Sequence, residues 1–245
     1  MTNTITKKLQ GQFERIFVNK YGPLIKKIIV NTLPDSDKIN IITSMPKLKS
    51  WVKKQKDPFP IFETRFELYE YVQTQYLQKD PIDYLEFGVF EGATVDFWRK
   101  LNQNPKSRFY GFDTFTGLPE TWKNLVSDRP SSTWDCQGKM PEIDDQRVRF
   151  YKGLFQDTID QFIRDYHPQD KIVIHNDSDL YSSSLYMLTR LHDFIKKDTI
   201  IIFDEFSNVM HEFRALEDYC AAYYRKYKVI AATKDFYLQI AIQFE

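Results

Sequence analysis

The sequence predicts an α/β fold: a seven-stranded, mostly parallel sheet with an antiparallel last strand and helices on both faces. Two observations carry this prediction. From residue 82 onward, short runs rich in β-branched and aromatic residues alternate with stretches of helical periodicity, which is typical of a parallel sheet built by crossovers. The last two apolar runs are separated only by residues 233–236, a connection too short for a crossover, so they form an antiparallel hairpin.

The first sixty residues are expected to form an extension outside this sheet. Apolar residues recur at roughly helical spacing over residues 9–33, and Tyr21-Gly22-Pro23 interrupts them, so two amphipathic helices are expected. Prolines recur between residues 34 and 60, which predicts a loop-rich connector. A helix over residues 62–77 then leads into the first strand. The predicted organisation is a basic helical extension and connector over residues 1–60, followed by one α/β domain over residues 61–245.

The alternation places the remaining elements in order. Strands are expected at residues 82–87, 108–112, 147–151, 171–174, 199–203, 228–232 and 237–244, and helices at 93–103, 157–166, 181–196 and 208–226. A long irregular stretch, about residues 114–146, interrupts the pattern. Loops of this length in compact domains are commonly lids or substrate-binding loops. Its Trp122 and Trp134 either stack on a sugar or aromatic acceptor or anchor the loop to the core.

Composition and charge limit the function classes. Residues 1–57 hold twelve Lys and Arg against four Asp and Glu, although the whole chain is formally neutral. The acidic remainder disfavours nucleic acid as a substrate, and the basic front leaves a peripheral contact with an anionic membrane as an alternative to packing on the domain or on a second subunit. The two cysteines form no metal or disulfide pattern, and no apolar run approaches the roughly 18 residues of a membrane span. A cytoplasmic homo-oligomer without a transmembrane segment is expected.

The stretch from Tyr84 to Thr94 has the outline of a strand-turn-helix ligand site. Glu86 ends an apolar run, Gly88 and Gly92 allow the backbone to approach a ligand, and Thr94 opens the next helix. The pattern is neither the dinucleotide fingerprint nor a phosphate loop with its lysine. An acid at this turn suits a ligand with a cationic amine and a ribose, such as S-adenosylmethionine (SAM). The alternative is an ordinary turn whose glycines serve packing.

Further acids follow other strands of the expected sheet. Asp113 follows the second strand, where it either accepts hydrogen bonds from ribose hydroxyls or caps a turn. Asp177 and Asp179 follow the fourth strand, and Asp204 and Glu205 follow the fifth. Because these two strands are neighbours in the expected topology, the carboxylates of Asp177, Asp204 and Glu205 should converge.

The convergence predicts a divalent-cation site. Asp177, Asp204 and Glu205 offer oxygen ligands only, which favours Mg²⁺ or another hard divalent ion. Such an ion lowers the pKa of a substrate hydroxyl, and Asp179 then takes the proton as general base. The alternative for Asp179 is a helix N-cap. His175 is expected to point away from the cluster and to be structural.

Five motifs together resemble those of the macrocin O-methyltransferase (TylF-like) family, from about residue 62 to the end of the chain. They are residues 85–92, 111–120, 152–158, 177–183 and 202–206. The resemblance implies a class I SAM-methyltransferase fold and, usually with Mg²⁺, methyl transfer to a hydroxyl of a sugar or small natural product. By position it implies that the metal ligands are Asp177, Asp204 and Glu205, the base is Asp179, and the SAM contacts are Glu86, Gly88, Gly92 and Asp113, with Gly153 and Phe155 near the adenine. Glu205 stands where the family often has a second Asp.

Two other functions stay open. Asp177-Ser178-Asp179 is also an Asp-x-Asp motif of metal-dependent glycosyltransferases, and the basic front is compatible with a non-catalytic SAM-fold scaffold that recruits an anionic partner. The function predicted from the sequence is SAM-dependent O-methylation of a sugar-like hydroxyl, assisted by a divalent cation.

Overall fold

The computed structural model describes residues 21–32, 36–55, 57–168 and 171–245. The chain divides into two units, residues 1–39 and 40–245. In the first unit, residues 21–32 are helical, so the predicted interruption at Tyr21-Gly22-Pro23 is wrong. The helix predicted before it, over residues 9–20, lies outside the described residues. Among the described helices, none is long and apolar enough to cross a membrane.

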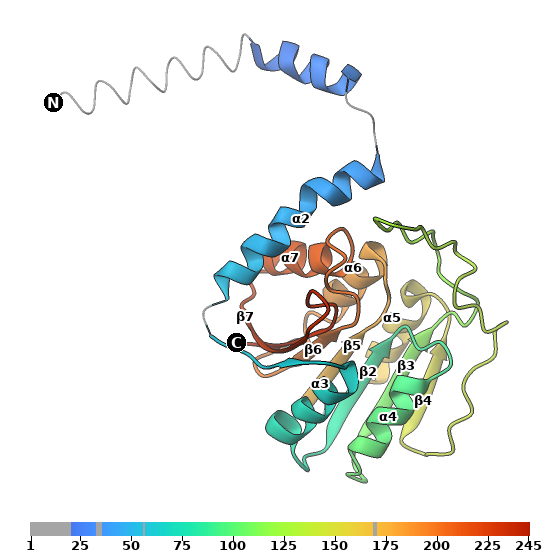
Figure 1. Ribbon diagram of the computed structural model, residues 1–245. Helices are drawn as coiled ribbons and strands as arrows, with labels where there is room; N and C mark the ends of the chain where they lie inside the picture. The colour runs from blue at the N-terminus through green and yellow to red at the C-terminus, as the bar shows by residue number, and fades with distance from the viewer. Residues whose placement is uncertain (1–20, 33–35, 56, 169–170) are drawn as a thin grey trace. The chain divides into compact units, whose positions relative to one another are not determined.

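A sheet of eight strands forms the centre of the second unit (Figure 1). In the order in which they lie side by side, the strands are β1 (Ile61–Phe62), β7 (Tyr227–Thr233), β8 (Ile240–Phe244), β6 (Ile200–Phe203), β5 (Lys171–Asn176), β2 (Ile82–Phe87), β3 (Arg108–Asp113) and β4 (Val148–Lys152). Only β8 is antiparallel to its neighbours, β6 and β7. All seven predicted strands are present, and the last is reversed as predicted.

The eighth strand, β1, is a short edge strand that the sequence did not predict. Its two residues pair in parallel with Ala232 and Thr233 of β7. Two residues are too few to show the alternation by which strands are recognised, so β1 exists because β7 offers it an unpaired edge.

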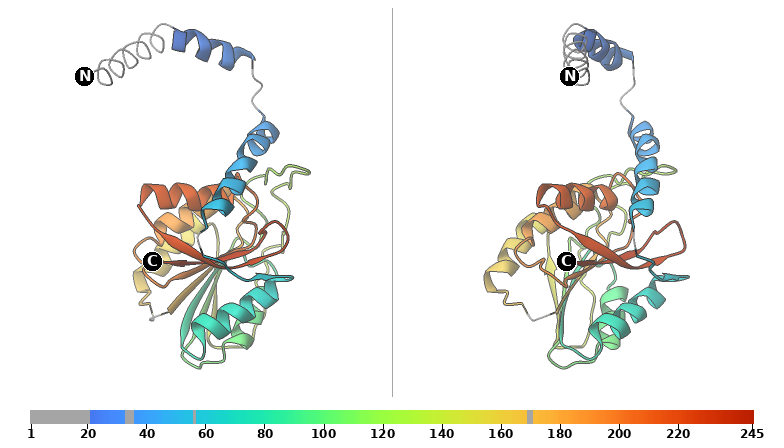
Figure 2. Two further views of the ribbon diagram at one scale, coloured as in Figure 1. Left: turned by 60° about the vertical axis from the view of Figure 1, so that its left-hand side comes forward. Right: turned by 90° about the vertical axis from the view of Figure 1, so that its left-hand side faces the viewer.

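Helices cover both faces of the sheet (Figure 2). One face carries α3 (Arg65–Val72), which continues as the π-helical turn η1 (Gln73–Leu77), and α4 (Ala93–Leu101). The other face carries α5 (Phe155–Asp165), α6 (Tyr181–Arg190), α7 (Glu212–Ala222) and part of α2 (Asp37–Lys54). Every residue of β2 is buried, because this strand is central and covered on both faces.

Helix α2 occupies most of residues 34–60, so the prediction of a loop-rich connector there is wrong. The helix runs through Pro46, which lies on its exposed side, where water can satisfy the carbonyl that Pro46 leaves unpaired. Ile41, Leu48 and Trp51 are buried against the domain. The Trp51 ring lies 4.9 Å from that of Phe206, and its Nε1 donates a hydrogen bond to the Tyr227 hydroxyl at 2.7 Å. Tertiary packing therefore overrides the local signal of the prolines.

The strand register brings four loops to one edge of the sheet. Phe87 of β2 pairs with Phe112 of β3 on one side and with Asn176 of β5 on the other, and Asn176 in turn pairs with Phe203 of β6. The loops that follow these strands therefore begin at the same level. This is the edge at which an open parallel sheet binds its ligands.

Candidate active site

A cavity of about 430 Å³ opens at this edge, between the loops that follow β2, β3, β4, β5 and β6. Eight of the predicted site residues line it: Gly88, Thr94, Asp113, Phe155, Asp177, Asp179, Asp204 and Glu205. Three others, Glu86, Gly92 and Gly153, are not among its lining residues. The structure thus brings the two predicted groups, the glycine turn and the acidic residues, to a single cavity.

Gly88 lets the turn after β2 lie against the loop after β5. Its φ is +92°, and a Cβ added there would lie 1.9 Å from the backbone oxygen of Asp177. The Asp177 N–H donates to the Phe87 carbonyl at 2.9 Å, which ties the two loops together. No residue with a side chain fits here, so the glycine is required by the close approach.

Gly92 and Gly153 support the cavity from outside its surface. Gly92 is the N-cap of α4 with φ +80°, and a Cβ there would meet the Pro141 ring at 2.8 Å. Gly153, after β4, has φ +141° and its N–H donates to the Asp113 carbonyl at 2.9 Å. Both shape the loops that line the site.

Asp113 organises the turn after β2. One of its carboxylate oxygens, Oδ2, accepts hydrogen bonds from the N–H groups of Val89 (2.7 Å) and Phe90 (2.9 Å), and Oδ1 accepts from the Phe115 N–H at 2.6 Å. The side chain also lines the cavity. Each carboxylate oxygen has more than one acceptor position, so the turn-capping role and the binding of ribose hydroxyls, posed as alternatives by the sequence, are compatible.

Glu86 lies beneath the cavity rather than on its wall. The side chain is buried and accepts a hydrogen bond from the Tyr84 hydroxyl. Its Oε2 lies 3.6 Å from Nδ1 of His175, which is also buried. Burial raises the pKa of Glu86, although the nearby His175 and the hydrogen bond from Tyr84 oppose this. Glu86 thus contacts other protein groups, and it lies one layer further from a ligand than the sequence suggested.

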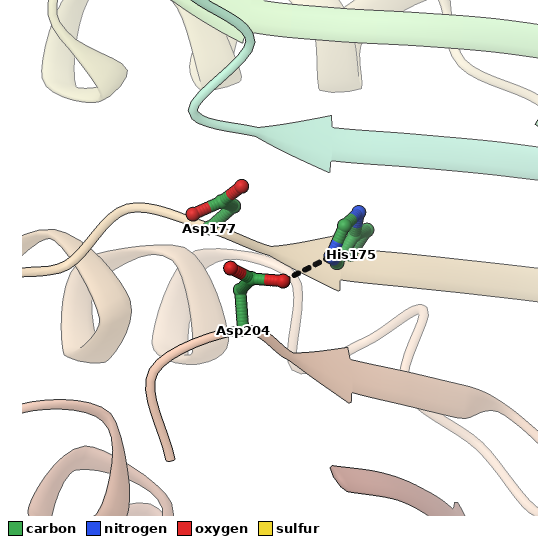
Figure 3. A group of neighbouring side chains, drawn as sticks. All are labelled: His175, Asp177 and Asp204. Atoms are coloured by element: carbon green, nitrogen blue, oxygen red, sulfur yellow. Dashed lines mark ion pairs between the residues drawn. The ribbon is translucent and has the colours of Figure 1, made fainter. Parts of the chain in front are cut away.

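His175 points toward the acidic cluster, so the expectation that it points away is wrong. Residues 175 and 177 are two apart, and side chains two apart lie on the same side of an extended chain. Figure 3 shows His175 directed at Asp204, with Asp177 beside them. The Nε2 atom of His175 lies 3.9 Å from Oδ1 of Asp204. One ligand atom from each of the three lies within 4.8 Å of the others.

His175 is nevertheless held by protein groups as a structural cation, and it is not available as a metal ligand. Its Nδ1 lies 2.8 Å from the Tyr84 hydroxyl, and its Nε2 lies 3.3 Å from that of Tyr69. Burial lowers its pKa, but the nearby carboxylates of Asp204 and Glu86 outweigh this and raise the pKa to about 9. A protonated imidazole has no lone pair for a metal, so the structural role predicted for His175 is the one its contacts support.

The acidic cluster carries more negative charge than its surroundings balance. Burial raises the pKa of Asp177 well above its ordinary range, and the charges of Asp204 and Asp179 raise it further. Burial likewise raises the pKa of Glu205 to about 7, with Asp204 contributing. Within the acidic cluster, Asp204 is the carboxylate whose pKa is lowered, because the effects of His175 and Arg65 outweigh that of its burial. Carboxylates in this state bind protons or other cations readily.

Asp179 faces the cavity with a carboxylate that is not used for capping. Helix α6 begins after Leu180, and no side chain caps it, so the N-cap alternative for Asp179 is not observed. Its φ is +61°, a left-handed conformation that Asp tolerates better than most residues. Burial raises the pKa of Asp179 well above its ordinary value, and Glu205 and Asp204 add to the shift. A raised pKa suits a carboxylate that exchanges protons near neutral pH.

A fifth carboxylate, Glu212, lies behind the cluster and was missed from the sequence. It is fully buried, and its Oε2 accepts the Glu205 N–H at 2.9 Å. Within the described part of the chain its Oε1 has no hydrogen-bond partner. Glu205 itself is held by Asn208, whose Nδ2 donates to Oε2 at 2.8 Å. Glu212 is the first residue of α7, seven residues after Glu205, and the bend between β6 and α7 turns its side chain back to the Glu205 backbone.

The two tryptophans of the long loop, Trp122 and Trp134, have different surroundings and different roles. Trp134 lines the cavity and is 36% exposed. Trp122 is buried, and its ring lies 6.2 Å from that of His211, whose Nε2 in turn contacts the Lys123 carbonyl at 2.7 Å. Trp122 therefore anchors the loop to α7, and Trp134 is the residue available to a ligand.

The fold agrees with comparisons to known proteins. Residues 63–231, more than half of the chain, match the model of the macrocin-O-methyltransferase (TylF) family. The chain belongs to the macrocin O-methyltransferase family. The comparison with curated protein sequences gives no match.

Solved structures similar to this macrocin O-methyltransferase family member share its fold. The O-methyltransferase NovP is 22% identical with a TM-score of 0.57, covering 73% of this chain and 78% of NovP. The calicheamicin methyltransferase CalS11 is 18% identical with a TM-score of 0.55, covering 86% and 94%. The apo structure of CalS11, described as a TDP-rhamnose 3'-O-methyltransferase, gives a TM-score of 0.51 at 18% identity, covering 88% and 98%. The class I SAM-methyltransferase fold is thereby confirmed.

Family membership establishes the enzyme class. The protein is a SAM-dependent O-methyltransferase. Of the functions left open by the sequence, methyl transfer is therefore the one supported, and the glycosyltransferase and scaffold alternatives are not.

Proposed function

We propose that this enzyme methylates a hydroxyl group of a sugar or sugar-containing small molecule with the help of a divalent cation, Mg²⁺ in the first place. One observation carries the proposal: Asp177, Asp179, Asp204 and Glu205 line the same cavity as the Gly88 turn and Asp113. The cavity thus joins a surface suited to SAM with a cluster suited to a cation and a base.

The SAM half of the cavity is formed by residues after β2, β3 and β4. Gly88 and Thr94 line the cavity and would lie along the methionine part, beside the N-terminal turn of α4. Asp113 would accept hydrogen bonds from the ribose, and Phe155 would lie near the adenine. Gly92 and Gly153 would support these loops, and Glu86 would act on SAM only at long range, through its charge.

The donor set of the acidic cluster fits a hard divalent cation. Asp177, Asp204 and Glu205 offer carboxylate oxygens at the ends of two neighbouring strands. Behind them, Oε1 of buried Glu212 has no hydrogen-bond partner among the described residues, a further sign that the site lacks positive charge. A divalent cation bound here would act as a Lewis acid and lower the pKa of the acceptor hydroxyl.

The protein residues would then position the acceptor and remove its proton. Asp179 would accept the proton of the acceptor hydroxyl, whose oxygen lone pair forms the new O–CH₃ bond. The bond between sulfur and the methyl group breaks, and its electron pair stays on sulfur, giving S-adenosylhomocysteine. Trp134 would cover the acceptor with its ring, a surface suited to the apolar face of a sugar.

A sugar as the acceptor is supported by a similar enzyme and by the residues that line the cavity. CalS11 is described as a TDP-rhamnose 3'-O-methyltransferase. In the present protein, an indole at the rim and carboxylates at the base offer stacking and hydrogen-bond acceptors together, which is what a polyhydroxylated ring requires.

We further propose that residues 61–245 form the functional domain, that the protein is a homo-oligomer, and that it is cytoplasmic. A functional domain over residues 61–245 is supported by a family match that begins at residue 63. A homo-oligomer is supported by the exposed apolar side chains of Leu24, Ile28 and Ile29 in helix 21–32. The free thiols of Cys136 and Cys220 suit the reducing cytoplasm.

Calorimetric titration of the purified protein with SAM, first with Mg²⁺ and then with EDTA, tests the proposal. Saturable SAM binding in both conditions is expected, followed by methylation of sugar acceptors that requires the metal. Methylation that continues undiminished in EDTA would remove the metal from the mechanism. Absence of SAM binding in both conditions would remove the assigned site.

A further inference from the structure

Among the described residues that line the cavity, Arg65 is the one basic residue. The other charged residues there are Glu91, Asp113, Asp177, Asp179, Asp204 and Glu205, all acidic. Arg65 comes from a different part of the chain, the first turn of α3, and neither its sequence context nor the motifs after the strands marked it as part of the site. Its position therefore calls for an explanation in terms of charge.

The Arg65 guanidinium lies against Asp204. A single nitrogen, Nη1, is 3.3 Å from both carboxylate oxygens of Asp204. The Tyr69 hydroxyl also donates to Oδ1 of Asp204, at 3.4 Å. Both oxygens of this carboxylate thus face protein donors. A divalent cation that binds Asp204 needs one of these oxygens, which Arg65 now contacts.

The backbone at Arg65 is held firmly, and its side chain reaches solvent. Thr64 and Glu67 form a capping box that fixes the start of α3, and the preceding β1 pairs with β7. A cation in the first turn opposes the helix dipole, so Arg65 is not explained by the stability of α3. Its side chain remains 35% exposed, against 7% for Asp204. The guanidinium can therefore turn toward solvent while the backbone stays in place.

A second arginine in the same domain shows what a permanent ion pair looks like. Arg108 donates from Nε and Nη2 to the two oxygens of Asp83, at 2.7 and 2.6 Å, and Asp83 is fully buried. That geometry is bidentate and short, as in strong structural pairs. Arg65 contacts Asp204 through one nitrogen at a longer distance, so its pair with Asp204 is the weaker and more easily exchanged of the two.

We propose that Arg65 is the resident counter-ion of the acidic cluster and competes with a divalent cation for Asp204. This proposal rests on the metal-assisted function proposed above. A guanidinium and a divalent ion on one carboxylate repel each other at short range. Cation binding therefore requires Arg65 to leave Asp204, and Arg65 limits how tightly the cation is held. Arg65 is a positioning residue for the cation and takes no part in bond making.

Direct measurement of Mn²⁺ affinity tests the competition. Mn²⁺ serves as the probe, and its free concentration is followed by electron paramagnetic resonance with the full-length protein. Arg65→Gln is expected to bind Mn²⁺ on the order of tenfold more tightly, whereas Arg65→Lys, which keeps the charge, stays close to the parent protein. Arg190→Gln is the matched control, because Arg190 pairs with Asp160 on the surface, away from the cavity. Equal or weaker Mn²⁺ binding by Arg65→Gln overturns the proposal.

Chemical labelling of the unmutated protein provides a second readout that does not depend on a variant. Phenylglyoxal modifies accessible guanidinium groups, and the sites are quantified by peptide mass spectrometry. Saturating Mn²⁺ is expected to raise the labelling rate of Arg65 severalfold and to leave that of Arg108 unchanged. Unchanged or reduced labelling of Arg65 while Mn²⁺ is bound contradicts its displacement.

SAM binding, measured calorimetrically in the same samples, separates this proposal from the proposed function. Normal SAM binding and metal-dependent methylation together with an unaltered Mn²⁺ affinity in Arg65→Gln would refute the role of Arg65 alone. SAM binding without any Mn²⁺ binding by either protein would refute both the metal and the competition. Tighter Mn²⁺ binding by Arg65→Gln with SAM binding intact supports both.

Discussion

Nδ1 of His175 lies 3.6 Å from Oε2 of Glu86, and both side chains are buried at the centre of the sheet. On its other side, His175 approaches Asp204 at 3.9 Å. The imidazole thus joins the carboxylate at the end of β2 to the carboxylate after β6. This arrangement makes His175 a charged structural element beneath the cavity.

Removing the charge of His175 should change how stability depends on pH. Burial lowers its pKa, but Asp204 and Glu86 raise it to about 9, above the value of about 6.5 for an unfolded chain. A group whose pKa is raised on folding contributes stabilisation that is complete below about pH 6.5 and is lost as pH rises through about 9. The melting temperature should therefore fall from pH 7 to pH 9.5, and His175→Gln should reduce that fall. If the melting temperatures of the two proteins fall by the same amount between pH 7 and pH 9.5, the idea that His175 is protonated is ruled out.

Asp179→Asn should slow methyl transfer without loss of SAM binding. Asn has the size of Asp and also tolerates the left-handed backbone at φ +61°, so the loop should keep its shape. Without the base, kcat should fall by about 10² to 10⁴. The measurement is steady-state kinetics with calorimetric SAM titration, and Asp160→Asn on the surface is the control. A kcat within about threefold of the parent value would assign the base elsewhere.

Gly88→Ala should disrupt the junction of the loops after β2 and β5. Its Cβ would lie 1.9 Å from the Asp177 backbone oxygen at φ +92°, so the loops must separate. Gly138→Ala is a matched control, since Gly138 also has positive φ (+73°) but its Cβ would meet only the end of the Lys152 side chain, at 2.8 Å. Thermal denaturation and SAM titration should show a lower melting temperature and weaker binding for Gly88→Ala than for the control. Equal effects would mean that backbone strain alone, about 1–2 kcal/mol, decides both.

The sequence was sufficient to predict the sheet and the cluster because both depend on local signals. Apolar runs located every strand from β2 to β8, and the acids that follow β5 and β6 converge because those strands are neighbours. These inferences need only the rule that parallel strands end at one edge. The family resemblance then connected the same residues with SAM.

The remaining parts of the site depend on contacts between distant segments. Arg65 and Asp204 are 139 residues apart in the sequence, so only the folded chain brings them together. Glu212 is seven residues after Glu205, and the bend between β6 and α7 turns its side chain back to the Glu205 N–H. The direction of His175 was mistaken even though alternation of side chains along a strand determines it. Helix α2 was missed because prolines dominate its local pattern, while the buried Trp51 and Leu48 that hold it have their partners elsewhere in the chain.

Asp177 and Glu205 should contribute unequally to cation binding. Asp177 belongs to the group whose ligand atoms lie within 4.8 Å of one another, whereas Glu205 lies outside that group and is held by Asn208. Asp177→Asn should therefore weaken Mn²⁺ binding by about 10² or more, and Glu205→Gln by about tenfold or less. Mn²⁺ titration of the two variants measures this directly. Equal losses would make Glu205 a full ligand whose side chain turns inward when the ion binds.

Trp134→Ala and Trp122→Ala should separate acceptor binding from stability. Trp134 lines the cavity and is partly exposed, so its loss should raise KM for the acceptor by about tenfold and change the melting temperature little. Trp122 is 5% exposed and lies against His211, the residue before α7, so its removal should lower the free energy of unfolding by about 3 kcal/mol or more. Denaturant unfolding and acceptor kinetics on both variants distinguish the roles. If Trp122→Ala were to raise the acceptor KM while Trp134→Ala left it unchanged, the assignment of the two rings would be reversed, because the anchored ring would then be the one that contacts the acceptor.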